Sequence, residues 1–171
     1  LSQQETTLLD STVVKGLHKS ILKEEVNYIN SKILAKKRDI DIVVNKKEEK
    51  YKNYMSAIEI IVRNDKDERI QVVGTVGAND EGRIINIKDH DLDMVISDNM
   101  IYLKNDDVPG VIGAVGAILG QLNINIATMN VGRKEHSAVM LLTVDSKVDK
   151  EGIDRLRELP QIKWAYYLDL K

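Results

Sequence analysis

Residues 100–131 read MIYLKNDDVPGVIGAVGAILGQLNINIATMNV, and this stretch decides the fold of the second half of the chain. The apolar residues within 101–104 predict a short strand, and the apolar stripe within 111–122 predicts an amphipathic helix. Pro109 stands in the first turn of that predicted helix, where its missing N–H would have no helical partner. Alternation over residues 124–131 then predicts a second strand.

The same kind of pattern continues to the end of the chain. Gly132 opens a predicted turn, and residues 137–144 form the next predicted strand. Apolar residues between 148 and 159 have helical spacing, Pro160 ends that helix, and residues 162–170 form a last strand. The order strand, helix, strand, strand, helix, strand is typical of the ferredoxin-like fold, with an antiparallel hairpin in the middle.

The first part of the chain predicts helices and a loop. Apolar residues at helical spacing predict one helix over residues 8–21 and a second over residues 26–37. Alternation over residues 40–44 predicts a strand, and the polar residues 45–53 predict a loop.

Four β-rich runs follow that loop and predict a single sheet with helices at one end. They lie at residues 57–62, 70–77, 83–87 and 91–95. The fold class is therefore α+β, with an α+β domain over residues 1–97 and a ferredoxin-like βαββαβ domain over residues 98–171.

The composition limits the possible function classes. The net charge is −2, and the basic residues are scattered among acidic ones, which argues against a nucleic-acid partner. No apolar run approaches the roughly 20 residues that a membrane span needs. The absence of cysteine excludes disulfides and thiolate sites and suits a cytoplasmic protein. The first residue, Leu1, is not Met, which suggests a chain that was cut from a longer protein or had its start trimmed.

Glycines at positions 110, 113, 116 and 120 follow a predicted strand and open a helix, as in a dinucleotide-binding fingerprint. Their intervals differ from the G-x-G spacing of that fingerprint and place them along one side of the helix. A helical glycine costs about 1 kcal/mol relative to alanine. We therefore expect close packing against this side of the helix.

The start of this helix predicts a small-molecule site. Unpaired N–H groups at Val111 and its neighbours attract a carboxylate. Asp107 can accept a hydrogen bond from an ammonium group, and the amide of Asn125 can bind either end of an α-amino acid. The alternative is that Asp107 only caps the helix and Asn125 is a turn residue, and the spacing leaves both interpretations open.

Catalytic and metal-binding motifs are not indicated. The three histidines, His18, His90 and His136, lie far apart, and no pair has i, i+4 spacing. A series of alternating carboxylates resembles part of a calcium loop but lacks its glycine and its final glutamate. These carboxylates belong to Asp89, Asp91 and Asp93. We therefore expect neither a catalytic residue nor a metal ligand in this chain.

Basic residues predict two candidate anion sites. Arg83 lies beside a glycine-containing turn, and Lys36 and Arg38 lie at the end of the second predicted helix. The alternative is that basic residues at a helix end only compensate the helix dipole.

A known family carries these motifs. Residues 105–133, NDDVPGVIGAVGAILGQLNINIATMNVGR, resemble the ACT domain that ends D-3-phosphoglycerate dehydrogenases, with its runs DRPGVIGxVGxxLG and NIAxMxxGR. Residues 26–30 (VNYIN) and 34–40 (LAKKRDI) resemble the family's VNYVNAPLLAKERGI stretch. Residues 74–76 (GTV) and 83–85 (RII) resemble another part of the intervening domain of the long enzymes.

The resemblance implies a regulatory function. The parent enzyme would oxidise 3-phospho-D-glycerate with NAD in serine biosynthesis, through amino-terminal catalytic domains that this chain lacks, and this chain would hold no cofactor. The ACT domain would bind L-serine between self-associated copies for feedback control. Asp107 and Asn125 match family residues that hold the amino acid, and Arg83 matches a basic anion-binding position. The other implied serine contacts are Asn105, Val108, Pro109, Gly110 and Val111.

Two alternatives remain open. Val108 replaces the family's usual Arg, and Asn105 stands where some members have His or Tyr. These differences motivate an oligomerisation module without serine sensing. Residues 132–135 (GRKE) suggest instead the regulatory region of an L-serine dehydratase, whose parent would carry an iron–sulfur cluster and no NAD.

Overall fold

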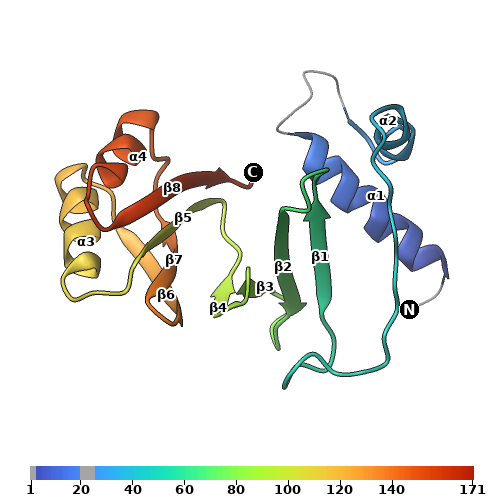
Figure 1. The fold of residues 1–171 in the computed structure, drawn as a ribbon, viewed down its shortest axis with the longest axis horizontal. Coiled ribbons are helices and arrows are strands. Elements are labelled where there is room, and N and C mark those ends of the chain that lie inside the picture. The colour runs from blue at the N-terminus through green and yellow to red at the C-terminus, as the bar shows by residue number, and fades with distance from the viewer. Residues whose placement is uncertain (1–2, 20–25) are drawn as a thin grey trace. The chain divides into compact units, whose positions relative to one another are not determined.

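The computed structural model describes residues 3–19 and 26–171, which form two compact units, Leu1–Glu49 and Lys50–Lys171. In Figure 1, the described helices of the first unit are α1 and α2, and the strands belong to the second unit. Among the described residues, no helix combines the length and the hydropathy that crossing a membrane requires.

The first unit contains two helices, α1 (Gln3–Lys19) and α2 (Ser31–Lys37). Val14 of α1 and Ala35 of α2 are buried. The helix predicted over residues 8–21 is confirmed as far as the chain is described, and its last two residues lie outside the described part.

The second predicted helix, over residues 26–37, is shorter than expected, because α2 begins only at Ser31. The side-chain oxygen of Asn27 accepts hydrogen bonds from the backbone N–H groups of Ile29 and Asn30, both at 2.9 Å. Such a local turn competes with helical hydrogen bonding, which a count of apolar residues does not detect.

The strand predicted over residues 40–44 is wrong. This segment has no regular secondary structure and pairs with no described strand. Ile42, Val43 and Val44 are all exposed. Alternation favours an extended chain, but a strand also needs a partner for its backbone groups.

The second unit begins with a four-stranded antiparallel sheet in the order β1-β2-β3-β4. These strands confirm the four predicted runs to within two residues. They are β1 (Ile58–Arg63), β2 (Arg69–Val76), β3 (Gly82–Ile87) and β4 (His90–Val95). The turn between β3 and β4 consists of Lys88 and Asp89, with φ angles of 47° and 67°. Positive φ at both positions is the geometry of a type I′ turn, which suits a two-residue hairpin.

The rest of this unit has the predicted order strand, helix, strand, strand, helix, strand. The four strands form an antiparallel sheet in the order β6-β7-β5-β8. The elements are β5 (Asn99–Asp106), α3 (Val111–Gln121), β6 (Ile126–Lys134), β7 (Ser137–Val144), α4 (Lys150–Arg157) and β8 (Ile162–Asp169). The ferredoxin-like fold is therefore confirmed.

Helices α3 and α4 cover one face of this sheet, as Figure 1 shows. Val115 and Leu119 of α3 and Leu156 of α4 are fully buried, and they pack against Leu103 and Leu142 of the sheet. Burying aliphatic side chains of this size stabilises a fold by about 1.5–3 kcal/mol each. Aliphatic side chains therefore form the core of this domain in a chain that has no phenylalanine.

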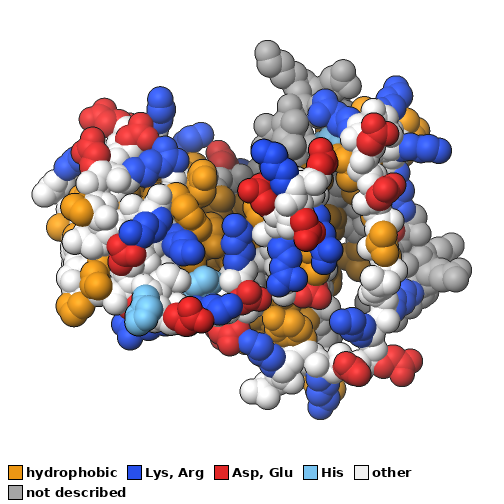
Figure 2. Space-filling model, in the orientation of Figure 1, with side chains coloured by type: hydrophobic (Ala, Val, Ile, Leu, Met, Phe, Trp, Pro, Cys, Tyr) orange, Lys and Arg blue, Asp and Glu red, His pale blue; other side chains and the backbone are white. Residues whose placement is uncertain are grey.

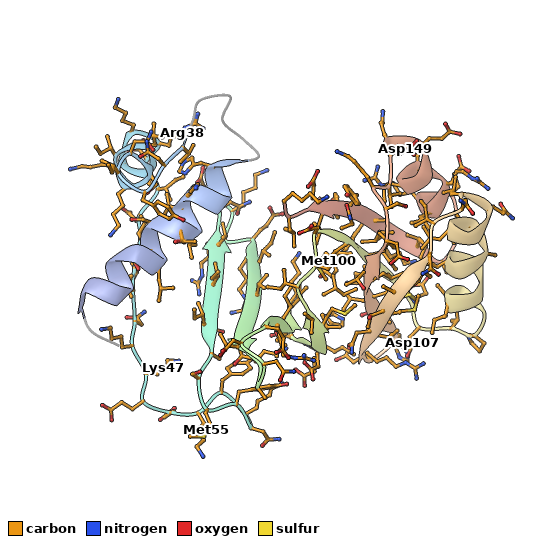
Figure 3. The ribbon with its side chains drawn as sticks, turned by 180° about the vertical axis from the view of Figure 1, so that it is seen from behind. Arg38, Lys47, Met55, Met100, Asp107 and Asp149 are labelled. Carbon is orange, nitrogen blue, oxygen red and sulfur yellow. The ribbon has the colours of Figure 1, made fainter. Side chains whose placement is uncertain are left out.

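The opposite face of this sheet packs against strands β3 and β4. Met94 of β4, Met100 of β5 (labelled in Figure 3) and Leu141 of β7 are buried in one apolar cluster. Strand β4 also approaches β6 closely, because a Cβ added to Gly132 would stand 2.6 Å from the carbonyl oxygen of Asp91.

Because of this shared cluster, both sheets belong to one compact unit, and the boundary between the two units of the chain lies between Glu49 and Lys50. The sequence places the domain boundary elsewhere, between residues 97 and 98. Two sheets that share a core form one compact unit even when they correspond to different sequence motifs. The boundary at 97/98 stays a prediction about the motifs.

Candidate functional site at the start of helix α3

The loop between β5 and α3 prepares a helix start without a side-chain cap. Gly110 is the N-cap residue, with φ at 92°, a conformation that side chains disfavour. Its carbonyl oxygen accepts the N–H of Ala114 at 2.9 Å. Pro109 lies before the helix instead of in its first turn. No side chain caps α3, so the first-turn N–H groups, beginning at Val111, keep their capacity to bind an anion.

Asp107 is held beside this helix start by the hairpin of β6 and β7. Its carboxylate lies 3.3 Å from the Nε atom of Arg133, and its backbone N–H donates to the carbonyl oxygen of His136 at 3.1 Å. The side chain of Asp107 is 27% exposed. The alternative that Asp107 caps α3 is therefore wrong, and its carboxylate has room for another partner.

Asn125 lies at the other end of β6. Its Nδ2 group donates to a carboxylate oxygen of Asp145 at 2.7 Å. Strand β6 has nine residues, so its ends are about 26 Å apart at about 3.3 Å per residue. Asn125 immediately precedes β6, whereas Asp107 contacts Arg133 near the end of this strand. Within one chain, Asp107 and Asn125 do not contact the same amino acid.

The remaining predicted contacts surround the same loop. Asn105 is 2% exposed, its Nδ2 group donates to the carbonyl oxygen of Asp106 at 2.7 Å, and its Oδ1 atom has no partner in the described part of the chain. Val108 is exposed, which leaves an uncharged surface where the family pattern has Arg.

One side of α3 is open. A Cβ atom added to Gly113, Gly116 or Gly120 would have no described atom within 4 Å outside the helix itself and the adjacent residues. No described segment of the chain packs closely here, so the close approach expected at these glycines stays a prediction. Strand β6 pairs with β7 alone and so forms an edge of its sheet, and β4 lies close to it at Gly132.

The predicted anion-binding residues fall in different units. Arg83 contacts Asp93 at 2.7 Å and Glu81 at 3.0 Å. The hydrogen bond to Asp93 is the main reason that the pKa of Arg83 is raised above its usual value. Lys36 and Arg38 lie at the end of α2, in the first unit. Anion binding at Arg83, and at Lys36 and Arg38, stays a prediction.

The described residues contain no group of three His, Asp or Glu side chains placed to hold a metal ion. The alternating carboxylates instead form ion pairs. Asp89 pairs with Lys134, Asp91 with Lys52, and Asp93 with Arg83. The glycines of α3 do not fit NAD, because that helix leads to the antiparallel β6–β7 hairpin and not to a parallel nucleotide-binding sheet.

Arg133 is the residue at this site whose role the sequence did not indicate. Asp107 and Arg133 are 26 residues apart in the chain, and the pairing of β5 with β7 together with the register of the β6–β7 hairpin brings them together. The glycine-arginine pair at positions 132 and 133 was the available signal, but a sequence motif does not indicate which residue the arginine contacts.

Comparisons with known proteins match both halves of the chain. The family model of the D-3-phosphoglycerate dehydrogenase intervening domain matches residues 1–88, and the ACT domain model matches residues 99–161. A D-3-phosphoglycerate dehydrogenase of Methanocaldococcus jannaschii is 37% identical over 99% of this chain and 32% of that enzyme. Those of Archaeoglobus fulgidus and Bacillus subtilis are 34% and 31% identical, with the same coverage. The chain thus spans about a third of the length of these curated relatives.

Proposed function

Because the chain belongs to the D-3-phosphoglycerate dehydrogenase family, we propose that it is the regulatory part of such an enzyme and that its ACT domain binds L-serine. The whole enzyme would oxidise 3-phospho-D-glycerate with NAD, using catalytic residues outside this sequence. Feedback control of serine biosynthesis is the role proposed for L-serine. A cytoplasmic location is proposed as well, and the absence of cysteine supports it.

The observation that carries the proposal is the chemistry around the start of α3. Uncapped N–H groups at Val111 suit the carboxylate of an amino acid, and the half-buried carboxylate of Asp107 suits its ammonium group. The amide of Asn125 supplies both a donor and an acceptor for the rest of the ligand.

The separation of Asp107 and Asn125 supports a site shared between two copies. Strand β6 is an edge strand, and antiparallel pairing of two β6 strands about a two-fold axis would bring the Asn125 end of one copy to the Asp107 end of the other. The open glycine side of α3 gives a partner backbone room to approach. Self-association is therefore part of the proposed function.

The test is isothermal titration of the chain with L-serine, with glycine and L-alanine as control ligands. We expect one L-serine per ACT domain, and binding of glycine and L-alanine weaker by at least about tenfold, because they lack the hydroxyl group. Asp107→Ala is expected to weaken L-serine binding by at least about tenfold through loss of a charge-assisted hydrogen bond.

The matched control is Asp106→Ala, which removes the adjacent carboxylate and its ion pair with Lys163. This variant is expected to bind L-serine normally. Unchanged L-serine affinity in the Asp107→Ala variant would contradict the assignment of the site.

The second candidate function is assembly without serine sensing. The observation that favours it is Val108, an exposed apolar residue at a position where the family pattern carries a charge. Sedimentation analysis that finds a dimer, together with no heat of L-serine binding, would favour this function. The third possibility, an L-serine dehydratase parent, is set aside because the chain belongs to the dehydrogenase family.

A further inference from the structure

The ion pair between Arg133 and Asp107 determines the charge of the proposed L-serine site. The Nε atom of Arg133 lies 3.3 Å from a carboxylate oxygen of Asp107. The neighbouring carboxylate is engaged elsewhere, because Asp106 is paired with Lys163 at 2.6 Å, and Val108 is uncharged. In the described part of the chain, Arg133 is therefore the basic residue that contacts Asp107.

The alternation of side chains along β6 places Arg133 on the side of the strand that faces this loop. Successive residues of a strand point to opposite faces of the sheet. Gly132 lies close to the backbone of β4, and Lys134 forms an ion pair with Asp89 in the turn before β4. Arg133 stands between these two residues, so its side chain lies on the other face, where it reaches Asp107.

The guanidinium group of Arg133 is accessible to a ligand. The side chain of Arg133 is 67% exposed, whereas that of Asp107 is 27% exposed. A guanidinium group has five N–H donors, so a contact with one carboxylate leaves donors for a second acceptor. The pair therefore presents an anion and a cation side by side, and both can contact the same small molecule.

A cation beside Asp107 has opposite effects on the two charged ends of an amino acid. The guanidinium group repels the ammonium group that Asp107 attracts, and it attracts the carboxylate of the same ligand. An amine without a carboxylate meets the repulsion alone, whereas a zwitterion gains the second attraction. Figure 2 shows acidic and basic side chains intermixed on the visible face of the second unit, and solvent ions screen exposed charges beyond about 8 Å. The local pair therefore dominates the charge that a ligand meets here.

We propose that Arg133 is a specificity-determining residue of this site, which accepts a zwitterionic α-amino acid and rejects an amine that lacks a carboxylate. The inference rests on the proposed L-serine site and adds a residue to it. The ammonium group of the ligand contacts Asp107, and its carboxylate contacts Arg133. Both charged groups of an α-amino acid are bonded to the same carbon atom, so an anion and a cation in contact with each other match their spacing.

The test is displacement calorimetry of the whole chain with L-serine and ethanolamine at neutral pH and matched ionic strength. Ethanolamine is L-serine without its carboxylate group, so it keeps the ammonium and the hydroxyl groups. We expect the wild type to prefer L-serine by at least about 100-fold, because ethanolamine leaves the donors of the site unpaired. Arg133→Gln is expected to lower this preference by at least about tenfold, since it removes both the contact with the carboxylate and the repulsion of the amine.

Three further variants complete the experiment. Arg133→Lys restores the positive charge and is expected to keep most of the preference for L-serine. Arg133→Met keeps the aliphatic stem of the side chain and gives a second measurement of the loss. An exposed ion pair contributes little to folding, so these variants are expected to unfold at the wild-type temperature. Lys134→Gln is the matched control, because Lys134 is the next residue of β6 and pairs with Asp89 on the other face.

The outcomes separate this proposal from the proposed function. A wild-type chain that does not bind L-serine would contradict both. If the wild type binds L-serine and Arg133→Gln and Arg133→Met keep the wild-type preference over ethanolamine, the proposal about Arg133 is overturned and the proposed function stands. An equal loss of L-serine and ethanolamine affinity would also overturn it, because Arg133 would then only hold Asp107 in place.

Discussion

At the residue scale, Gly132 shows how one small side chain permits the contact between two sheets. A Cβ at this position would meet a backbone oxygen of β4 at 2.6 Å, and backbone cannot move aside as a long side chain can. The φ angle of Gly132 is not positive, so backbone conformation does not require glycine here. The close approach of β4 is what requires it.

Gly132→Ala is therefore expected to destabilise the second unit by about 1–3 kcal/mol, the usual cost of overpacking. The matched control is Gly82→Ala in β3, where the added Cβ would make an ordinary contact at 3.4 Å with the flexible end of Ile96. Urea unfolding followed by Trp164 fluorescence measures both. Equal stability of the two variants would show that β4 does not approach β6 as described.

The ion pair between Lys52 and Asp91 gives a second prediction at this scale. The hydrogen bond from Lys52 lowers the pKa of the Asp91 carboxyl group, and the same bond raises the pKa of Lys52. A lowered carboxyl pKa stabilises the folded state above the group's ordinary pKa, and this stability is lost as pH falls through the folded value. The raised lysine pKa acts at the alkaline end, where stability is lost as pH rises.

Lys52→Met should therefore flatten the loss of stability below about pH 4, the ordinary range of an aspartate. The effect is small because both side chains are at least half exposed. Urea midpoints measured from pH 2.5 to pH 7 in the wild type and the variant provide the test. Parallel pH profiles for the two proteins would mean that the pair contributes nothing.

At the scale of elements, helix α3 carries glycines that its own chain does not require. Replacing a helical glycine with alanine stabilises an isolated helix by about 1 kcal/mol. Because the space around Gly116 is open, an added methyl group can give the monomer this increase in stability. A partner that approaches the same side closely would clash with the added methyl group.

Gly116→Ala is therefore expected to raise the stability of the monomer and weaken self-association by at least about threefold, through overpacking at the contact. Sedimentation equilibrium measures the dimer dissociation constant, and unfolding at low protein concentration measures the monomer. A variant that gains stability and dimerises normally would place the interface elsewhere.

The sequence predicted the elements best where the apolar period was long and turn residues marked the ends. Every element of the ferredoxin-like part was expected, and only its ends differ by a few residues. The segment at residues 40–44 failed because alternation does not reveal whether a partner strand exists. The pairing of Asp107 with Arg133 was not predictable, because it depends on the register of a hairpin.

At the scale of the molecule, the second unit has two sheets that share one apolar cluster. Met100 is fully buried in that cluster, between side chains of β4 and β7. The sheet of β1–β4 and the sheet of β5–β8, here called the ACT sheet, are therefore expected to unfold together, although one family model matches β1–β3 and another matches β5–β7.

Met100→Ala should lower the free energy of unfolding by about 2–5 kcal/mol, the range for large-to-small changes in a core. The single tryptophan, Trp164, reports on the ACT sheet, and hydrogen exchange of β2 and β3 amides reports on the other sheet. Both probes should shift by the same amount. A shift confined to the tryptophan signal would mean that the sheets unfold independently.

The central claim is that L-serine binds between two copies, with Asp107 from one and Asn125 from the other. The most direct test mixes Asp107→Ala chains with Asn125→Ala chains after unfolding and refolding, and titrates the mixture with L-serine. Each variant alone should fail to bind. Random pairing makes about half of all dimers in the mixture heterodimers, and each heterodimer has one intact site of its two. About a quarter of the wild-type stoichiometry should therefore return. A mixture that remains inactive, although co-purification of differently tagged chains shows that heterodimers have formed, would contradict a shared site.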